Sequence, residues 1–184
     1  MASGPTSCDK WRSIEVTDSL EGTEGIVDRY ERSIDVGVGQ EEAVFRRLED
    51  RLLRYQIFPP RIMRSEICSD DGRIHEDTTI VQYVSVGPVP LESAVRVQRM
   101  WHSTEAELEE TGFSYATIRG HPERGVSTFR IRRTPGRITF LIDARSRPGS
   151  ILTRVGRPIA RRFQRAATEA ALDHVLAGAD GLGS

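Results

Sequence analysis

Residues 157–178, RPIARRFQRAATEAALDHVLAG, predict a long amphipathic helix close to the C-terminus. Pro158 suits the first helical turn and Gly178 the stop. One face collects mostly small and apolar residues, namely Ile159, Phe163, Ala167, Ala170, Ala171 and Val175, together with His174. The opposite face carries arginines. Because alanine side chains are small, this helix can lie close across a sheet or roof a cavity above one.

Seven stretches upstream of this helix alternate between apolar and polar residues, as strands do. They span residues 28–36, 61–68, 77–86, 91–102, 112–118, 127–133 and 137–146. Pro and Gly at 87–90 (GPVP) and 134–137 (TPGR) predict tight reversals, so consecutive strands should pair antiparallel. Between the first two strands, residues 40–58 predict an amphipathic helix that Pro59 and Pro60 end.

This order of elements predicts an α+β fold in which a curved antiparallel sheet of about seven strands wraps around the C-terminal helix. Such a helix-grip arrangement holds an internal cavity between the helix and the sheet. We expect one domain over residues 25–178. The polar residues 1–24 predict a flexible leader, and residues 179–184 a flexible tail.

The composition is that of an ordinary globular protein, with 38% hydrophobic and 29% charged residues and a net charge of −1. This balance argues against strong binding to nucleic acid or to an anionic membrane. No apolar run reaches the length of a transmembrane helix, and the N-terminus lacks the apolar core of a signal peptide. We expect a monomer or a homodimer.

The cysteines and histidines give no sign of a disulfide framework, a metal site or a cofactor site. Cys8 and Cys68 lie far apart in the sequence, which favours reduced thiols and a cytoplasmic protein. The histidines lack the spacing of metal ligands. The sequence also contains no glycine-rich phosphate loop and no nucleophile elbow, so we expect neither a metal nor a cofactor.

Three motifs carry a resemblance to a known family: GFSYATIRGHPERG at 112–125, ARSRPGS at 144–150 and GRPIARRFQRAA at 156–167. Over residues 27–175 the chain resembles the domain of unknown function 1990 family, also called uncharacterised protein family 0548. The resemblance implies a helix-grip fold similar to the START and Bet v 1 proteins. Members of those groups bind lipids, hormones and polyketides, and some are aromatases or cyclases.

The chain departs from the family pattern in two places. Relatives follow Gly125 with two acidic residues, where this chain has Val126 and Ser127. Asp143 stands among apolar neighbours, where an uncharged residue is expected in relatives. These differences favour specialised chemistry over a housekeeping role.

Tyr115, His121 and Glu123 are the first candidate catalytic residues. Tyr115 shares a strand face with Phe113 and Thr117, and would offer a phenol to a ligand if that face is concave. Glu123 could orient the His121 imidazole for proton transfer. Alternatively, GHPERG is a structured turn in which both side chains bind loop backbone.

Asp143 is the fourth candidate catalytic residue, and it has two possible environments. On an inward face, burial would raise its pKa and make it a general acid or base. On the other face it would meet solvent or form an ion pair with Arg130 or Arg132. The second environment is favoured, because the apolar residues of this strand fall on the opposite face.

The remaining candidates would bind substrate, and they are Arg99, Trp101, Phe113, Arg147 and Phe163. Arg147 could pair with a substrate carboxylate or cap backbone carbonyls before the last helix. Strict alternation puts Arg99 and Trp101 on one face with Val95 and Val97, and His102 on the other face with Gln98 and Met100. One of these two sets should enter the cavity.

These features favour an enzyme of specialised metabolism that holds a polyketide-like molecule and assists its cyclisation or dehydration by acid–base catalysis. The alternative is a noncatalytic carrier or sensor of a small hydrophobic ligand. Both hypotheses need the cavity. Only the first needs a proton donor, so single replacements of the four catalytic candidates would separate the two.

Overall fold

The computed structural model describes residues 7–17, 26–86, 89–148 and 157–180. Its centre is a seven-stranded antiparallel sheet with the order β1-β7-β6-β5-β4-β3-β2. The strands are β1 (Ile26–Asp35), β2 (Met63–Ile67), β3 (Thr79–Val86), β4 (Val89–Glu105), β5 (Leu108–Thr117), β6 (Glu123–Thr134) and β7 (Arg137–Pro148). All seven predicted strands are therefore present.

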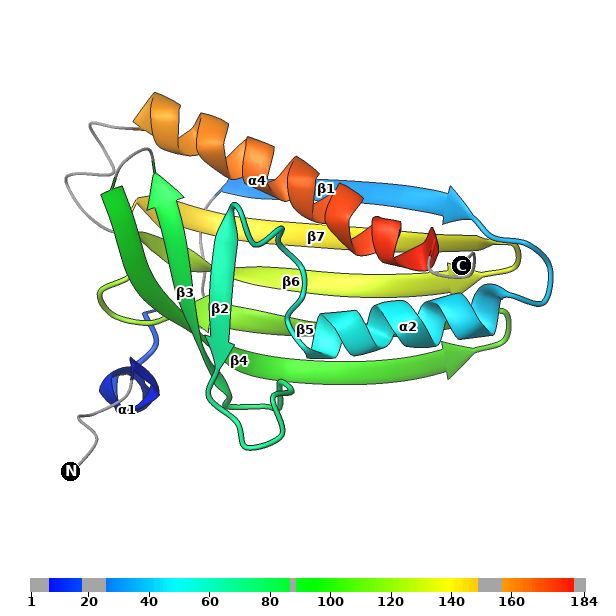
Figure 1. Ribbon diagram of the computed structural model, residues 1–184, viewed down its shortest axis with the longest axis horizontal. Coiled ribbons are helices and arrows are strands. Elements are labelled where there is room, and N and C mark those ends of the chain that lie inside the picture. Colours follow the sequence, from blue (N-terminus) through cyan, green and yellow to red (C-terminus); the bar gives the residue numbers. More distant parts are fainter. Residues whose placement is uncertain (1–6, 18–25, 87–88, 149–156, 181–184) are drawn as a thin grey trace.

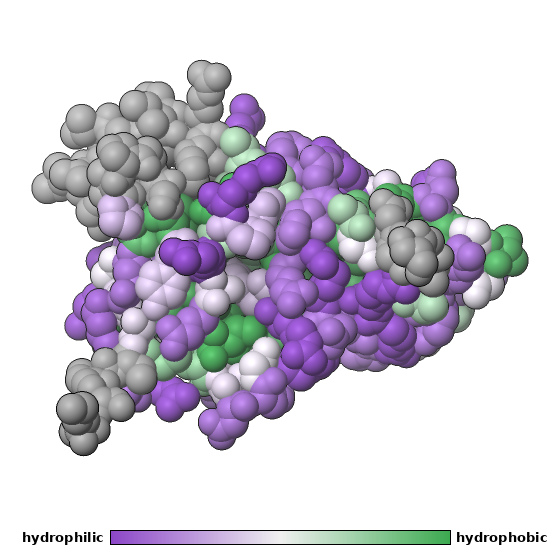
Figure 2. Space-filling view, viewed as in Figure 1, coloured by the Kyte–Doolittle hydropathy of each residue, from purple (hydrophilic) through white to green (hydrophobic). Residues whose placement is uncertain are grey.

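Two helices, α2 (Glu41–Leu53) and α4 (Arg157–Ala177), lie on the same face of the curved sheet (Figure 1). Together with the inward residues of the strands they form the main core. Their outward faces make the surface of this side of the molecule mostly hydrophilic (Figure 2). The predicted helix-grip arrangement, in which the sheet wraps around a long C-terminal helix, is confirmed.

The half of the interior beneath α2 is filled by side chains. Val44, Phe45, Leu48 and Leu52 lie on one face of α2, and each is at most 2% exposed. Their spacing of three to four residues is the reason that they share this face. They pack against inward residues of the sheet, so this half of the protein is a conventional close-packed core.

Helix α2 ends five residues earlier than the two prolines predict. The amide of Tyr55 donates to the carbonyl of Leu52, and the amide of Gln56 donates to that of Arg51. This pair of bonds is a Schellman motif, which normally has glycine at the position of Tyr55. Tyr55 adopts φ 51°, a left-handed conformation that costs a bulky residue about 1–2 kcal/mol.

The N-terminal region differs from the flexible leader that its composition predicts. Residues 7–12 form the short helix α1 (Ser7–Arg12), and Val16 forms a β-bridge with Ile118. Cys8, Trp11, Val81, Ala94 and Ile118 make a second apolar cluster on the outer face of the sheet. Short-range periodicity is too weak here to reveal a helix of six residues, whose stability comes from this packing.

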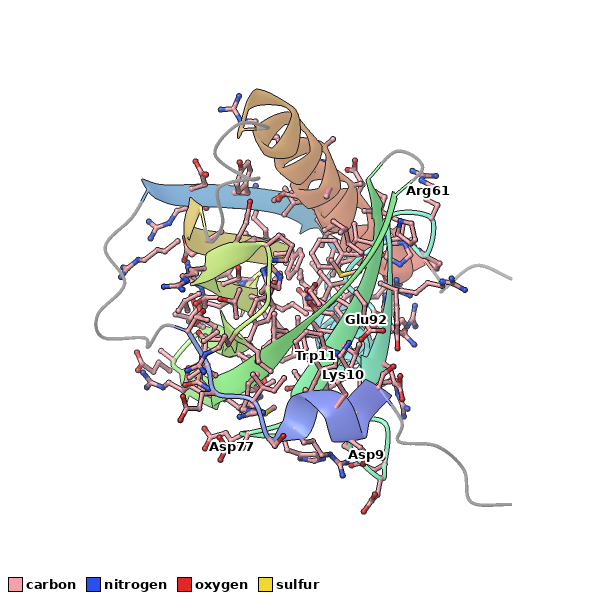
Figure 3. All side chains as sticks on the ribbon, turned by 90° about the vertical axis from the view of Figure 1, so that its left-hand side faces the viewer. Asp9, Lys10, Trp11, Arg61, Asp77 and Glu92 are labelled. Carbon is pink, nitrogen blue, oxygen red and sulfur yellow. A yellow bond between two sulfur atoms is a disulfide. The ribbon has the colours of Figure 1, made fainter. Side chains whose placement is uncertain are left out.

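A disulfide between Cys8 and Cys68 joins α1 to the end of β2. Lys10 and Trp11 both bind Glu92 of β4 at 2.8 Å, and Figure 3 shows the three side chains together. The expectation of reduced cysteines is wrong, because folding brings together residues 60 positions apart. The cysteines therefore give no support to the cytoplasmic assignment. None of the described helices is long and apolar enough to cross a membrane.

The C-terminal end also differs from the prediction in part. Residues Gly178–Asp180 form a 3₁₀ helix, η1, beside α2. Ala179 is buried in the main core, and its carbonyl accepts a hydrogen bond from Arg47. The flexible tail was predicted to start at residue 179, but this residue is packed in the core. Its last residues, 181–184, lie outside the described residues.

Gly112 on β5 allows the Trp101 ring to lie against the outer face of the sheet. A Cβ atom at this position would come within 2.5 Å of the Trp101 ring and 2.7 Å of the Phe129 carbonyl oxygen. We expect Gly112→Ala to lower the free energy of unfolding by about 2 kcal/mol through overpacking. Urea denaturation would measure the change.

The matched control is Gly37→Ala. The added methyl group would meet only the flexible side chain of Gln40, at 3.3 Å. This variant should stay within about 0.5 kcal/mol of the wild type. Equal losses in both variants would contradict the role given to Gly112.

Candidate functional site

Aromatic side chains gather on the inner face of the sheet, beyond the part that α2 fills. The rings of Phe113 and Phe129 stack with centroids 5.2 Å apart, and Tyr115 lies 5.4 Å from Phe129. Tyr55 and Phe58 approach this group from the segment after α2. Phe113, a predicted substrate-binding residue, is thus in the interior, and so is Tyr115.

Hydrogen-bonding groups are embedded in this aromatic wall. The side-chain amide of Gln82 donates to the Tyr55 hydroxyl at 2.7 Å, and both residues are buried. Tyr115 is also buried; its ring centroid lies 6.4 Å from that of Tyr55, and Ser127 is its partner in the sheet register. Burial raises the pKa of both phenols, and that of Tyr55 well above its ordinary value. Both hydroxyls therefore keep their protons at neutral pH.

His121 and Glu123 lie at the turn between β5 and β6, near the end of the Tyr115 strand. The His121 Nδ1 is 3.1 Å from the Glu123 amide and 2.9 Å from its carbonyl oxygen, which matches the alternative of a structured turn. Burial lowers the pKa of His121 to about 4. Burial also raises the pKa of Glu123, so both groups favour their uncharged forms.

Asp143 lies on the opposite face of the sheet and does not join these residues. It forms ion pairs with Arg130 of β6 and, at 2.6 Å, with Arg29 of β1. The ion pair with Arg130 is the environment that its strand pattern favours. The inward reading of Asp143 is thereby ruled out, because Phe140 and Ile142 occupy the inner face of β7.

Arg99 and Trp101 also point away from the interior, because a β-bulge interrupts β4. Val97 pairs with Tyr115 and Arg99 pairs with Ser114, so Gln98 is an extra residue. The bulge reverses the alternation after Val97. The Trp101 indole then donates to Glu110 at 3.0 Å on the outer face. The predicted placement of these two substrate-binding residues in the cavity is wrong for this reason.

The same bulge turns Met100 and His102 toward the helices. Strict alternation placed Val95 and Val97 on one face with Arg99 and Trp101. The extra residue Gln98 instead puts them on the inner face with Met100 and His102, because one inserted residue exchanges the two faces of the strand beyond it. For the last two predicted substrate-binding residues, Arg147 and Phe163, the side chains lie outside the described residues. Arg147 belongs to β7 and Phe163 to α4 by their backbone.

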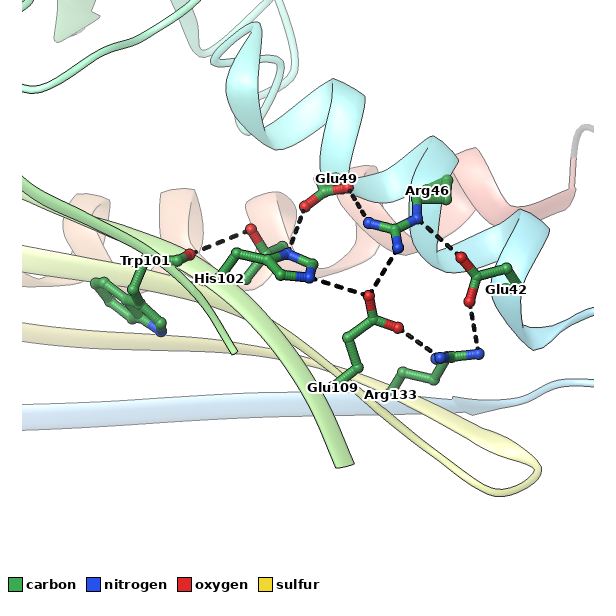
Figure 4. Close-up of polar contacts among 8 residues, drawn as sticks. Glu42, Arg46, Glu49, Trp101, His102, Glu109 and Arg133 are labelled. Carbon is green, nitrogen blue, oxygen red and sulfur yellow. Dashed lines mark hydrogen bonds and ion pairs between the residues drawn. The ribbon is translucent and has the colours of Figure 1, made fainter. Parts of the chain in front are cut away.

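His102 belongs to an ionic network that fixes α2 to the sheet at the end remote from the β5–β6 turn (Figure 4). Its two ring nitrogens lie 3.1 Å from Glu49 and 3.2 Å from Glu109. Glu109, only 3% exposed, also pairs with Arg46 at 3.0 Å and with Arg133 at 2.5 Å. This end of the interior is therefore closed by charges as well as by the packed side chains of α2.

Sequence reasoning missed Tyr55 and Gln82 as members of the interior group. The sequence pattern predicts Tyr55 as an ordinary helix residue. The alternation of β3 gives no reason to select the Gln82 amide as a residue of the site. Within the described ranges, no three His, Cys, Asp or Glu side chains come together as metal ligands. The residues that the structure does bring together are a wall of aromatic rings, two buried tyrosines and the half-buried His121–Glu123 turn.

Solved structures with the same fold are similar to this chain. TTHA0849 from Thermus thermophilus is 12% identical, covers 86% of this chain and 100% of its own, and gives a TM-score of 0.57. Hypothetical protein jhp0584 from Helicobacter pylori is 10% identical, with 96% of each chain covered and a TM-score of 0.56. A START superfamily protein from Mycobacterium smegmatis is 13% identical, covering 81% and 96%, with a TM-score of 0.47.

At such low identities the likeness concerns the fold alone. No curated protein matches the sequence. A family match is found instead, and it covers residues 18–174 with the description "Domain of unknown function (DUF1990)". This range includes all seven strands, α2 and nearly all of α4. The chain therefore belongs to the DUF1990 family, with the helix-grip fold that its sequence motifs imply.

Proposed function

We propose that the protein binds a small, largely apolar molecule in the interior between α4 and the aromatic wall of the sheet. The observation that carries this proposal is Tyr115, a buried residue with a polar hydroxyl whose ring lies among those of Tyr55, Phe113 and Phe129. Sites for such ligands combine apolar walls with a few fixed polar groups. Because α2 fills the other half of the interior, the ligand is expected beside Tyr115.

The charge state of the site supports an uncharged ligand. His121 is neutral at pH 7, because burial lowers its pKa to about 4. The buried phenols also stay uncharged, and arginines such as Arg29 and Arg130 are engaged with Asp143 on the outer face. No full charge from these groups has to be desolvated when an apolar molecule enters.

A second candidate function is acid–base catalysis on the bound molecule, for example cyclisation or dehydration of a polyketide-like chain. The observation in its favour is the opposite direction of the pKa shifts of His121 and Glu123, two groups of the same turn. Burial raises the pKa of Glu123, which favours a carboxylic acid, and lowers that of His121, which favours a neutral base. Pairs shifted in this way can divide acid and base roles.

The test of binding is mass spectrometry of small molecules released from the purified, denatured protein. We expect one apolar compound in near-equimolar amount, and a higher melting temperature when it is added back. Protein that releases no such compound, and whose melting temperature responds to no apolar aromatic probe, would contradict the proposal. Catalysis would show as conversion of the compound by the wild type but not by Glu123→Gln.

A further inference from the structure

β1 is a long strand at one edge of the sheet (Figure 1). It has ten residues and pairs with β7 on one side, and none of the residues that the structure describes forms a strand on its other side. The opposite edge strand, β2, has only five residues. Sheets commonly protect an edge by keeping it short, because its N–H and C=O groups can pair with another chain. β1 is long enough for such pairing.

The hydrogen bonds between β1 and β7 show which backbone groups of β1 point away from the sheet. Directly after β1, the amide of Val36 donates to the carbonyl of Gly136 at 2.9 Å, and the register is regular over the whole of β1. Residues of an antiparallel strand bond to a given neighbour in alternation. The N–H and C=O groups of Arg29, Glu31 and Ser33 therefore point away from β7. These groups form the β1 edge.

The charges of β1 make the strand complementary to itself. The sequence around its middle is Asp28-Arg29-Tyr30-Glu31-Arg32. If a second copy of β1 pairs antiparallel with the two Tyr30 residues opposite each other, Arg29 faces the second copy's Glu31. Asp28 faces the second copy's Arg32 in the same way. Every one of these cross-strand pairs joins opposite charges, which stabilises antiparallel strands.

The backbone and the charges select the same register. Arg29 and the second copy's Glu31 both have their N–H and C=O groups in the β1 edge, so the two residues can exchange two hydrogen bonds. Sliding one strand by two residues keeps such bonds but places Arg29 opposite Arg29, or Glu31 opposite Glu31. Like charges at directly opposite positions are destabilising. Pairing about Tyr30 therefore has no equally favourable neighbour, and it also brings two aromatic rings side by side.

The ion pairs within one copy are compatible with this arrangement. Arg29 binds Asp143 at 2.6 Å through Nε, and its side chain is 67% exposed. A guanidinium has five N–H donors, so it can bind a second carboxylate. Glu31 is exposed as well. Arg32 lies on the inner face, where it pairs with Glu169 of α4 at 2.7 Å.

We propose that the protein forms a symmetric homodimer in which the β1 strands of two copies pair antiparallel about Tyr30 and join the two sheets. The partner is a second copy of this chain, because the charge order of β1 complements itself in this orientation. A twofold axis between the two Tyr30 residues lets both copies use the same surface. The proposal does not depend on whether a ligand binds in the interior.

Sedimentation velocity over a range of protein concentrations tests the dimer, and the wild type should associate reversibly. Glu31→Arg places arginines opposite each other at two positions and should weaken the dimer at least about tenfold. Arg29→Glu places carboxylates opposite each other and should weaken it similarly. The matched control is Glu107→Arg, which makes the same change of charge at an exposed position in the turn between β4 and β5. This control should keep the wild-type dissociation constant.

An equimolar mixture of the two β1 variants gives a sharper comparison. In a mixed pair, the arginines of the Glu31→Arg protein face the glutamates of the Arg29→Glu protein at both positions. The mixture should therefore dimerise at a concentration at which each variant alone is monomeric. Arg29→Glu also removes the ion pair with Asp143, so circular dichroism would first show that this variant is folded.

Amide hydrogen exchange tests the register in the wild type without any substitution. The amides of Arg29, Glu31 and Ser33 should exchange more slowly as the protein concentration rises. Those of Tyr30 and Arg32, which bond to β7, should be protected at every concentration. A monomeric wild type, a dimer that Glu31→Arg does not weaken, or exchange of the first three amides that is independent of concentration would overturn the proposal.

Discussion

Reduction of the Cys8–Cys68 disulfide should lower the free energy of unfolding by about 4 kcal/mol. The bond closes a loop of 60 residues, and a cross-link of this length removes a corresponding amount of entropy from the unfolded chain. For a protein of this size the melting temperature should fall by roughly 12 °C. Calorimetry with and without dithiothreitol would measure both quantities.

The control is the double variant Cys8→Ala and Cys68→Ala, whose melting temperature should not respond to dithiothreitol. Trp11 packs beside Cys8, so its fluorescence should also change on reduction of the wild type. A melting temperature that is the same in oxidised and reduced wild type would contradict the stabilising effect given to the Cys8–Cys68 disulfide.

Acidification from pH 6.5 to 4 should destabilise the wild type through His121. Its pKa is about 4 in the folded protein, and near 6.5 when the chain is unfolded. Between these values the unfolded chain binds a proton that the folded protein does not, so stability falls as the pH falls. The contribution is fully present above pH 6.5 and amounts to about 3 kcal/mol.

Glu123 acts in the opposite direction, because burial raises its pKa and the folded protein then holds its proton at a higher pH. The His121 contribution is therefore measured as the difference between the wild type and His121→Asn over this pH range. Asparagine offers an oxygen to the Glu123 amide in place of Nδ1. If both proteins lost stability equally on acidification, His121 would not be buried as described.

The fold could be predicted almost completely from the sequence. The strands at 127–133 and 137–146 lie within β6 and β7, and the helix at 157–178 matches α4 to one residue. Long alternating segments with glycine and proline between them leave few choices of pairing. The long C-terminal helix was expected to cover the apolar face of the sheet, and the structure places α2 on the same face beside it.

The failures arise where one residue or one distant contact decides the outcome. Gln98 is an extra residue in β4, and the sequence pattern does not predict the bulge that it forms. Its effect is to turn Arg99 and Trp101 outward and His102 inward. The Cys8–Cys68 pair could not be inferred from spacing, since only the tertiary fold brings the two thiols together.

The candidate site was predicted in part. Tyr115 and Phe113 could be placed on one face by alternation, and both lie in the interior. Tyr55 could not be found, because its role depends on a left-handed conformation after α2. The apolar neighbours of Asp143 in the sequence did not show its environment. Its carboxylate pairs with two arginines on the strands beside β7, and this pairing explains a charged residue at that position.

The most direct test of binding in the interior is nuclear magnetic resonance of the complex with 2-acetylnaphthalene. Isotope-filtered nuclear Overhauser effects should connect the probe to Phe113, Tyr115 and Phe129 on the inner face. Effects that connect the probe only to Trp11 or Trp101 would place it on the outer face of the sheet and contradict the account.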